Sequence, residues 1–287
     1  MLRGQLPTTA TQRFFDESPH IRSAGTRKEW RRLLRRLERR YPHKRVNEYT
    51  SEDLRDFLLC DDDGTPTRRA HTTIATQRTA LRSFFSWAHY AGLHPEDPAL
   101  ALTRLVNVKP TPVRTHHWLS GEEIEALFAA CHDDPCDLLG ERDALAIAFG
   151  VLCALRIHEI ANVRWGDLNL RARTVSVLGK GQKLATVPLP GDLVDMLTKW
   201  RTRTTDGLGR LPSTEDPVLI TFRSSGGAPW QNARHLAPEW EKACGLHGLR
   251  TAIKKRAKKI GIPELAPHDL RRTFAGRLED KGVTVHV

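Results

Sequence analysis

The residues that decide the fold stand at positions 144–160, ALAIAFGVLCALRIHEI, where an apolar stretch stops at an arginine. Residues 144–155 are apolar without interruption between Asp143 and Arg156. A membrane-spanning helix needs about 20 such residues, so this shorter run predicts a helix buried in a protein core, over roughly 142–153. Glu159 follows Arg156 at a spacing of three, which suits an ion pair on one helical turn.

Lys180 stands in the middle of a predicted β-hairpin. Residues 174–177 (TVSV) and 184–189 (LATVPL) are β-like runs that flank the segment 179–182 (GKGQ). Two such runs joined by a short glycine-containing segment are typical of antiparallel strands and their turn. The pattern therefore places Lys180 at the tip of a hairpin.

A third segment, residues 267–275 (PHDLRRTFA), opens a predicted helix that carries His268 and Arg271. Taken singly, each of the three segments has a structural explanation. The arginine and glutamate of the first form an ion pair, the lysine of the second is an exposed turn residue, and the histidine of the third caps a helix.

Together the three segments resemble the tyrosine recombinase family, also called the phage integrase family. The family pattern is A/G-L-R-x-x-E-L, then a G-K-G hairpin with a following V-P-L strand, then H-x-L-R-H/R. Here these stand in the same order as ALRIHEI (154–160), GKGQKLATVPL (179–189) and HDLRR (268–272). The resemblance covers nearly the whole chain. It implies a mainly α fold, with an all-helical core-binding (SAM-like) N-terminal domain and a mixed, mostly helical catalytic domain with a small antiparallel β-sheet.

The resemblance also implies site-specific DNA integration or excision by transesterification at a phosphodiester, with no metal and no cofactor. Arg156 and Arg271 match the two arginines that clamp the scissile phosphate, and guanidinium groups suit the charge that develops on its oxygens. Lys180 matches the lysine that protonates the leaving 5′-hydroxyl, and His268 the histidine that assists proton transfer. Glu159 matches an acidic residue that orients the first arginine. The sequence shows no carboxylate cluster of the kind that holds magnesium.

The family's nucleophilic tyrosine, which follows the second arginine, has no match here. The three tyrosines are Tyr41, Tyr49 and Tyr90, and none of the residues after Arg271 is a tyrosine. We therefore expect a sequence that stops before its nucleophile and cannot cleave DNA by itself. The alternative is a non-catalytic relative that occupies recombination sites and regulates or blocks recombination.

Basic residues are concentrated in two stretches of a chain whose net charge is +11. Residues 22–45 hold eleven Lys and Arg against two Glu, with apolar residues at helical spacing, and a second basic run covers 254–259. A helix with one packed face and one face of arginines suits a phosphate backbone, although a solvated surface helix is the alternative explanation. The predicted partner is double-stranded DNA. The predicted DNA contacts are Arg31, Arg35, Arg39, Lys254, Lys255 and Lys258.

The chain is predicted to form two domains. Residues 1–107 are expected to be the helical core-binding domain that clamps DNA, and residues 116–287 the catalytic domain. Residues 108–115 lie in a segment with two prolines and little apolar content, which is typical of a linker.

The five cysteines form an odd set without a disulfide framework, which favours a reducing cytosol. We therefore expect a cytoplasmic protein, associated with the nucleoid and not with a membrane. The resemblance implies self-association on DNA, as a tetramer.

Overall fold

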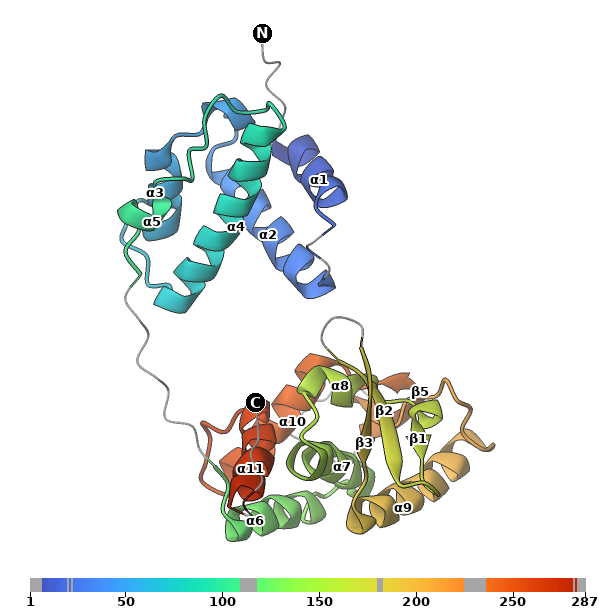
Figure 1. The fold of residues 1–287 in the computed structure, drawn as a ribbon. Helices are drawn as coiled ribbons and strands as arrows, with labels where there is room; N and C mark the ends of the chain where they lie inside the picture. Colours follow the sequence, from blue (N-terminus) through green and yellow to red (C-terminus); the bar gives the residue numbers. More distant parts are fainter. Residues whose placement is uncertain are drawn as a thin grey trace. The chain divides into compact units, whose positions relative to one another are not determined.

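The computed structural model describes residues 7–19, 21, 23–108, 118–179, 183–224, 236–280 and 282. The chain divides into two compact units, Met1–Arg114 and Thr115–Val287 (Figure 1), and each has its own hydrophobic core. Most of the predicted linker 108–115 lies outside the described residues, as does Lys180.

The first unit is built from helices, as predicted. They are α1 (Pro7–Glu17), α2 (Ala24–Arg40), α3 (Ser51–Leu59), α4 (His71–Tyr90) and α5 (Leu102–Leu105), with a 3-10 turn at Val46–Glu48. An aromatic cluster fills the core between α1 and α4. The ring of Phe14 meets that of Phe84 edge-on at 5.4 Å, and Phe84 meets Phe85 at 5.1 Å. Edge-to-face packing of this kind adds to the stabilisation from apolar burial.

Helix α2 confirms the amphipathic pattern of the basic N-terminal stretch. The Ser23 side chain caps the helix by accepting a hydrogen bond from the Thr26 backbone N–H at 3.3 Å. Leu33, Leu34 and Leu37 are buried, so the arginines between them are carried on the remaining faces of the helix.

The second unit surrounds one buried helix. Its helices are α6 (Gly121–His132), α7 (Asp137–Cys153), α8 (Ile157–Asn162), α9 (Gly191–Leu208), α10 (Leu246–Lys259) and α11 (Pro267–Glu279). Helix α7 contains most of the apolar run and packs against the other five helices that the structure describes in this unit. A Cβ atom on Gly150 would lie 2.9 Å from the Leu270 side chain. The glycine therefore lets α11 approach the end of α7 closely.

The second unit also holds two small antiparallel sheets. The first joins β1 (Leu168–Asn169), β2 (Thr174–Leu178) and β3 (Leu184–Pro188), and the second joins β4 (Ile220–Ser224) and β5 (Leu236–Ala243). Leu178 pairs with Leu184 at the last register position of β2 and β3, and the Gly179 N–H donates to the Lys183 carbonyl at 2.8 Å. The predicted hairpin is confirmed by this pairing. Within the described ranges, no helix is long and apolar enough to cross a membrane.

Candidate active site

Arg156 is anchored by Glu159 at the start of α8. The Arg156 backbone N–H donates to Glu159 Oε2 at 2.7 Å, and Arg156 Nη1 donates to Oε1 at 3.0 Å. The Glu159 side chain is 3% exposed, whereas that of Arg156 is 40% exposed. The predicted ion pair therefore exists, and it also holds a half-exposed guanidinium in one orientation.

Arg271 reaches the same place from α11, which is more than a hundred residues later in the chain. Its Nη1 donates to the backbone carbonyl of Ala154 at 2.6 Å. Ala154 ends α7 in the left-handed conformation, with φ 53° and ψ 26°. Partial burial lowers the pKa of Arg271, and the positive charge of Arg156 lowers it further. The two guanidinium groups therefore interact electrostatically, and they repel each other.

His268 lies in the first turn of α11, where Asp269 caps the helix by accepting a hydrogen bond from the Ala266 N–H at 2.8 Å. The pKa of His268 is below its ordinary value because of partial desolvation and the positive charges of Arg272 and Arg271, with a smaller contribution from Arg156. The lowered pKa favours a neutral imidazole at neutral pH.

Four of the five residues predicted for the site thus lie together: Arg156, Glu159, His268 and Arg271. The fifth, Lys180, lies outside the described residues, although the strands on both sides of it are ordered as a hairpin. Ala154 was part of the quoted motif, but the sequence pattern did not predict a role for its carbonyl group. This group of side chains brings excess positive charge to one place, which is the requirement for binding a phosphate.

The basic run at 254–259 contains one cation that is not on the surface and that was not among the predicted DNA contacts. Arg256 is fully buried and donates to Asp143 Oδ2 at 2.7 Å and to Asp134 Oδ2 at 2.5 Å. Lys254, Lys255, Lys258 and Lys259 are exposed, and Lys255 also pairs with Asp134 at 3.8 Å. The predicted contacts Lys254, Lys255 and Lys258 face solvent and remain candidates for DNA contact.

The arginines of α2 also divide into two groups. The guanidinium of Arg31 lies 4.9 Å from the Phe15 ring centre, and that of Arg36 lies 4.4 Å from the Phe57 ring centre. Arg40 donates to the backbone carbonyls of residues 60 and 61. Arg35 and Arg39 are exposed. Packing therefore uses part of the predicted basic face.

A basic groove of about 490 Å³ lies in the first unit between α2 and α4. Gln77 links its two sides, since its Oε1 accepts from Arg36 at 3.1 Å and from Arg69 at 3.0 Å. The polar and charged residues that line the groove are Glu29, Arg32, Arg36, Arg39, Arg69, Thr73, Thr76 and Gln77.

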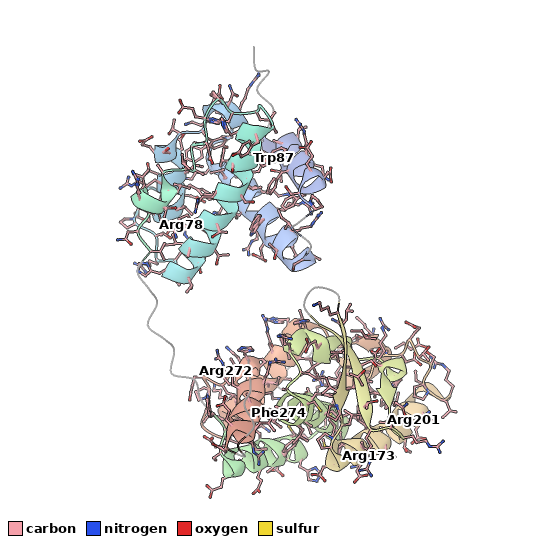
Figure 2. All side chains as sticks on the ribbon, viewed as in Figure 1. Arg78, Trp87, Arg173, Arg201, Arg272 and Phe274 are labelled. Atoms are coloured by element: carbon pink, nitrogen blue, oxygen red, sulfur yellow. The ribbon has the colours of Figure 1, made fainter. Side chains whose placement is uncertain are left out.

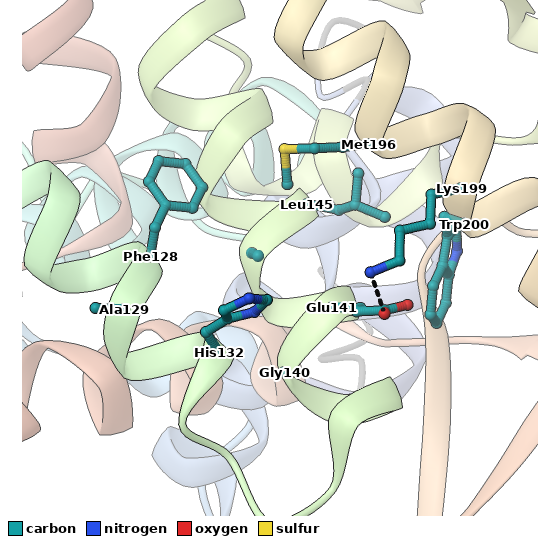
Figure 3. A pocket seen from close by; sticks show the side chains of 10 residues that line it. Phe128, Ala129, His132, Gly140, Glu141, Leu145, Met196, Lys199 and Trp200 are labelled. Atoms are coloured by element: carbon teal, nitrogen blue, oxygen red, sulfur yellow. Dashed lines mark ion pairs between the residues drawn. The ribbon is translucent and has the colours of Figure 1, made fainter.

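An apolar pocket of about 330 Å³ in the second unit is separate from the arginine cluster. It lies among α6, α7 and α9 and is lined by Phe128, Met196 and Trp200 (Figure 3). The ion pair between Lys199 Nζ and Glu141 Oε1, at 2.9 Å, stands at its edge. None of the predicted site residues lines this pocket.

Comparison with known proteins places the chain in a family. The model of the phage integrase family matches residues 117–287, and that of the phage integrase N-terminal SAM-like domain matches residues 18–92. A tyrosine recombinase of Thermosipho africanus is 25% identical over 96% of this chain and 87% of its own length. The chain belongs to the phage integrase family, the tyrosine recombinases.

Solved structures show the same fold at low sequence identity. The integrase of the Tn1549 transposon, in complex with transposon right end DNA, has a TM-score of 0.63 at 15% identity over 96% of this chain and 88% of its own. A lambda integrase dimer bound to a COC′ core site has a TM-score of 0.62 at 15% identity, over 96% of this chain and 90% of its own.

Proposed function

We propose that this protein binds double-stranded DNA at a recombination site and holds the scissile phosphate with Arg156, His268 and Arg271. The observation that carries this proposal is the convergence of the three side chains from two helix starts that are distant in sequence. In the proposed organisation, residues 1–107 clamp the DNA, residues 116–287 hold the phosphate, and residues 108–115 join them.

The two arginines supply the charge and His268 supplies a further hydrogen bond. In a transesterification, a hydroxyl attacks the phosphorus and gives up its proton, for which neutral His268 is the proposed acceptor, while the bond to the 5′-oxygen breaks and that oxygen takes up a proton. The equatorial oxygens gain negative charge in the transition state, and fixed guanidinium groups stabilise it. Glu159 keeps one guanidinium in place, and Lys180 is proposed to protonate the 5′-oxygen from the hairpin.

The proposed partner is a duplex rather than a single strand, because basic residues recur on both units. In the first unit, the groove between α2 and α4 and the exposed Arg35 and Arg39 are the proposed backbone contacts, together with Arg31. In the second unit, the proposed backbone contacts are Lys254, Lys255 and Lys258. The two integrases solved as DNA complexes, one of them a dimer, support self-association on DNA. A DNA substrate of this kind implies a location at the nucleoid in the cytoplasm.

The test is to isolate fragments of the host replicon that the protein retains, and to map the protected bases by footprinting. The Arg271→Gln variant should lose protection around one phosphate. Arg201→Gln is the matched control, since Arg201 is an exposed arginine on α9 that Figure 2 shows on the other side of the unit from Arg272. Equal footprints for both variants would remove Arg271 from the interface.

The second candidate is a protein that binds recombination sites without cutting them. The observation that favours it is the position of the tyrosines, all three of which lie in the first unit. Tyr49 is 2% exposed, burial raises its pKa, and the Tyr41 hydroxyl donates to the Asp53 carbonyl at 3.0 Å. The 287-residue chain should form no covalent adduct with a nicked substrate under either candidate, because no tyrosine follows Arg271. Adding a C-terminal extension that carries a tyrosine distinguishes them, because only a chain with recombinase chemistry then forms the adduct, and Arg271→Ala should abolish it.

A further inference from the structure

Ala154 adopts a backbone conformation that alanine rarely takes. Its φ of 53° is positive, and among the described residues other than glycine it shares this property with Arg173, at 54°. The left-handed region brings Cβ too close to the following carbonyl oxygen. A residue held there without glycine's freedom points to a constraint imposed by its surroundings.

The turn at Ala154 connects the two arginines of the site. The N–H groups of Ala154 and Leu155 both turn back to the Phe149 carbonyl, the second at 3.2 Å, and so close the end of α7. Arg156 then starts α8 one residue later. The carbonyl of Ala154 accepts from Arg271 Nη1 at 2.6 Å.

We propose that Ala154 is a positioning residue for Arg271, and that its left-handed backbone aims the carbonyl that fixes this guanidinium for phosphate binding. The role in phosphate binding rests on the proposed function. A guanidinium has five N–H donors, and within the described ranges the carbonyl of Ala154 takes one of those of Arg271, which leaves donors for an anion.

A neutral carbonyl can orient an arginine without cancelling its positive charge, which a carboxylate would do. Glu159 holds Arg156 but also offsets its charge. The carbonyl orients Arg271 and leaves its full positive charge in the site. The two arginines are thus held by one carboxylate and one neutral carbonyl, and the remaining positive charge can act on a bound phosphate.

The first experiment measures the pKa of His268 by NMR in the absence of DNA, with His268→Gln to identify its signal among the 13 histidines. Arg271, Arg272 and Arg156 lower this pKa, along with partial desolvation, and Asp269 raises it. Valine tolerates the left-handed region poorly, so Ala154→Val should displace Arg271 and raise the pKa of His268. Ala154→Gly should leave it unchanged.

The matched control is Arg173→Val, at the other residue with this conformation. The Arg173 carbonyl accepts from the Leu189 N–H at 2.8 Å, and Figure 2 shows Arg173 away from Arg272 on α11. This variant should lose thermal stability as Ala154→Val does, without a change in the pKa of His268. The same His268 pKa in Ala154→Val and Ala154→Gly would overturn the proposal.

The second experiment measures affinity for inorganic phosphate in a double-mutant cycle. Ala154→Val should weaken binding about tenfold, the equivalent of one charge-assisted hydrogen bond, in the wild-type background and not in Arg271→Gln. Additive losses would show that Ala154 acts on stability alone. If the valine variant does not fold, Ala154→Ser takes its place in the cycle. Should Arg271→Gln itself bind phosphate normally, the proposed function fails, while the His268 measurement still tests the geometry.

Discussion

Two pairs of arginines in the second unit are arranged in opposite ways. Arg142 and Arg256 lie inside the unit and share Asp143, whose two oxygens accept at 2.7 and 2.8 Å, and Arg256 has Asp134 as a second partner. Arg156 and Arg271 are partly exposed, one held by Glu159 and the other by a carbonyl. The two buried arginines are balanced by two aspartates, and these ion pairs hold the helices that carry them together. Among the described residues, the other two arginines are balanced by a single glutamate, which leaves positive charge to attract an anion.

The largest effect is expected on breaking the buried pair. Asp143→Asn leaves two buried guanidinium groups without their shared carboxylate, which costs about 3–5 kcal/mol of the free energy of unfolding. Urea denaturation measures this loss. Glu141→Gln is the matched control on the same helix, because Glu141 pairs with the exposed Lys199 and Arg203, and surface pairs contribute about 0–1 kcal/mol. Equal stability of the two variants would contradict the distinction between the pairs.

Substitutions of the partly exposed pair, Arg156 and Arg271, should chiefly reduce DNA affinity, whereas substitution at the buried pair chiefly reduces stability. Arg156→Gln and Arg271→Gln are each expected to weaken binding to the cognate duplex by roughly 10- to 100-fold, the loss of one charge-assisted contact to a phosphate. For Arg271→Gln the free energy of unfolding should change by less than about 1 kcal/mol, because the substitution also relieves repulsion between the two arginines. Arg156→Gln should cost more, because it leaves the buried carboxylate of Glu159 without its guanidinium partner. Affinity by fluorescence anisotropy and stability by urea denaturation give the two values. A variant that loses stability and keeps affinity would place Arg156 or Arg271 with the structural pair.

The sequence predicts the partly exposed pair better than the buried one, for a physical reason. Arg156, Glu159, His268 and Arg271 lie in short motifs that resemble those of the tyrosine recombinase family, and that resemblance predicts them as one site, whereas local spacing alone predicts only the ion pair of Arg156 with Glu159. Arg256 stands in a uniformly basic run, and its partners Asp134 and Asp143 come from more than a hundred residues earlier. Nothing local distinguishes it from the lysines beside it. The carbonyl of Ala154 depends on one backbone angle, which the residue type does not determine.

The affinity for DNA should depend on pH, because the pKa of His268 differs between the free site and the site with a bound phosphate. Partial desolvation and the charges of Arg272 and Arg271 lower the pKa of His268 below its ordinary 6.5. A bound phosphate offsets those charges and raises the pKa, so binding takes up a proton. Affinity should therefore increase as the pH falls through the region of 6.5, by at most about tenfold for a shift of one pKa unit. His268→Gln should flatten this profile, whereas His247→Gln, at an exposed position on α10, should not. A flat profile in the wild type would contradict the placement of His268 beside the phosphate.

The smallest expected effect is on the salt dependence of DNA binding and concerns the arginines of α2. These also divide into arginines that pack against the first unit and arginines that face solvent. Arg35 and Arg39 are exposed, whereas Arg31 lies 4.9 Å from the Phe15 ring. Each arginine that neutralises a phosphate contributes about one to the slope of log affinity against log salt concentration. Arg35→Gln and Arg39→Gln should each lower that slope by about one. Arg31→Gln should change it less and instead cost about 0.5–1 kcal/mol of stability through the lost cation–π contact. A slope change for Arg31→Gln equal to the others would show that its guanidinium leaves Phe15 to meet the DNA. Unchanged slopes for all three variants would remove α2 from the interface, because no other property of these substitutions compensates for a lost counterion release.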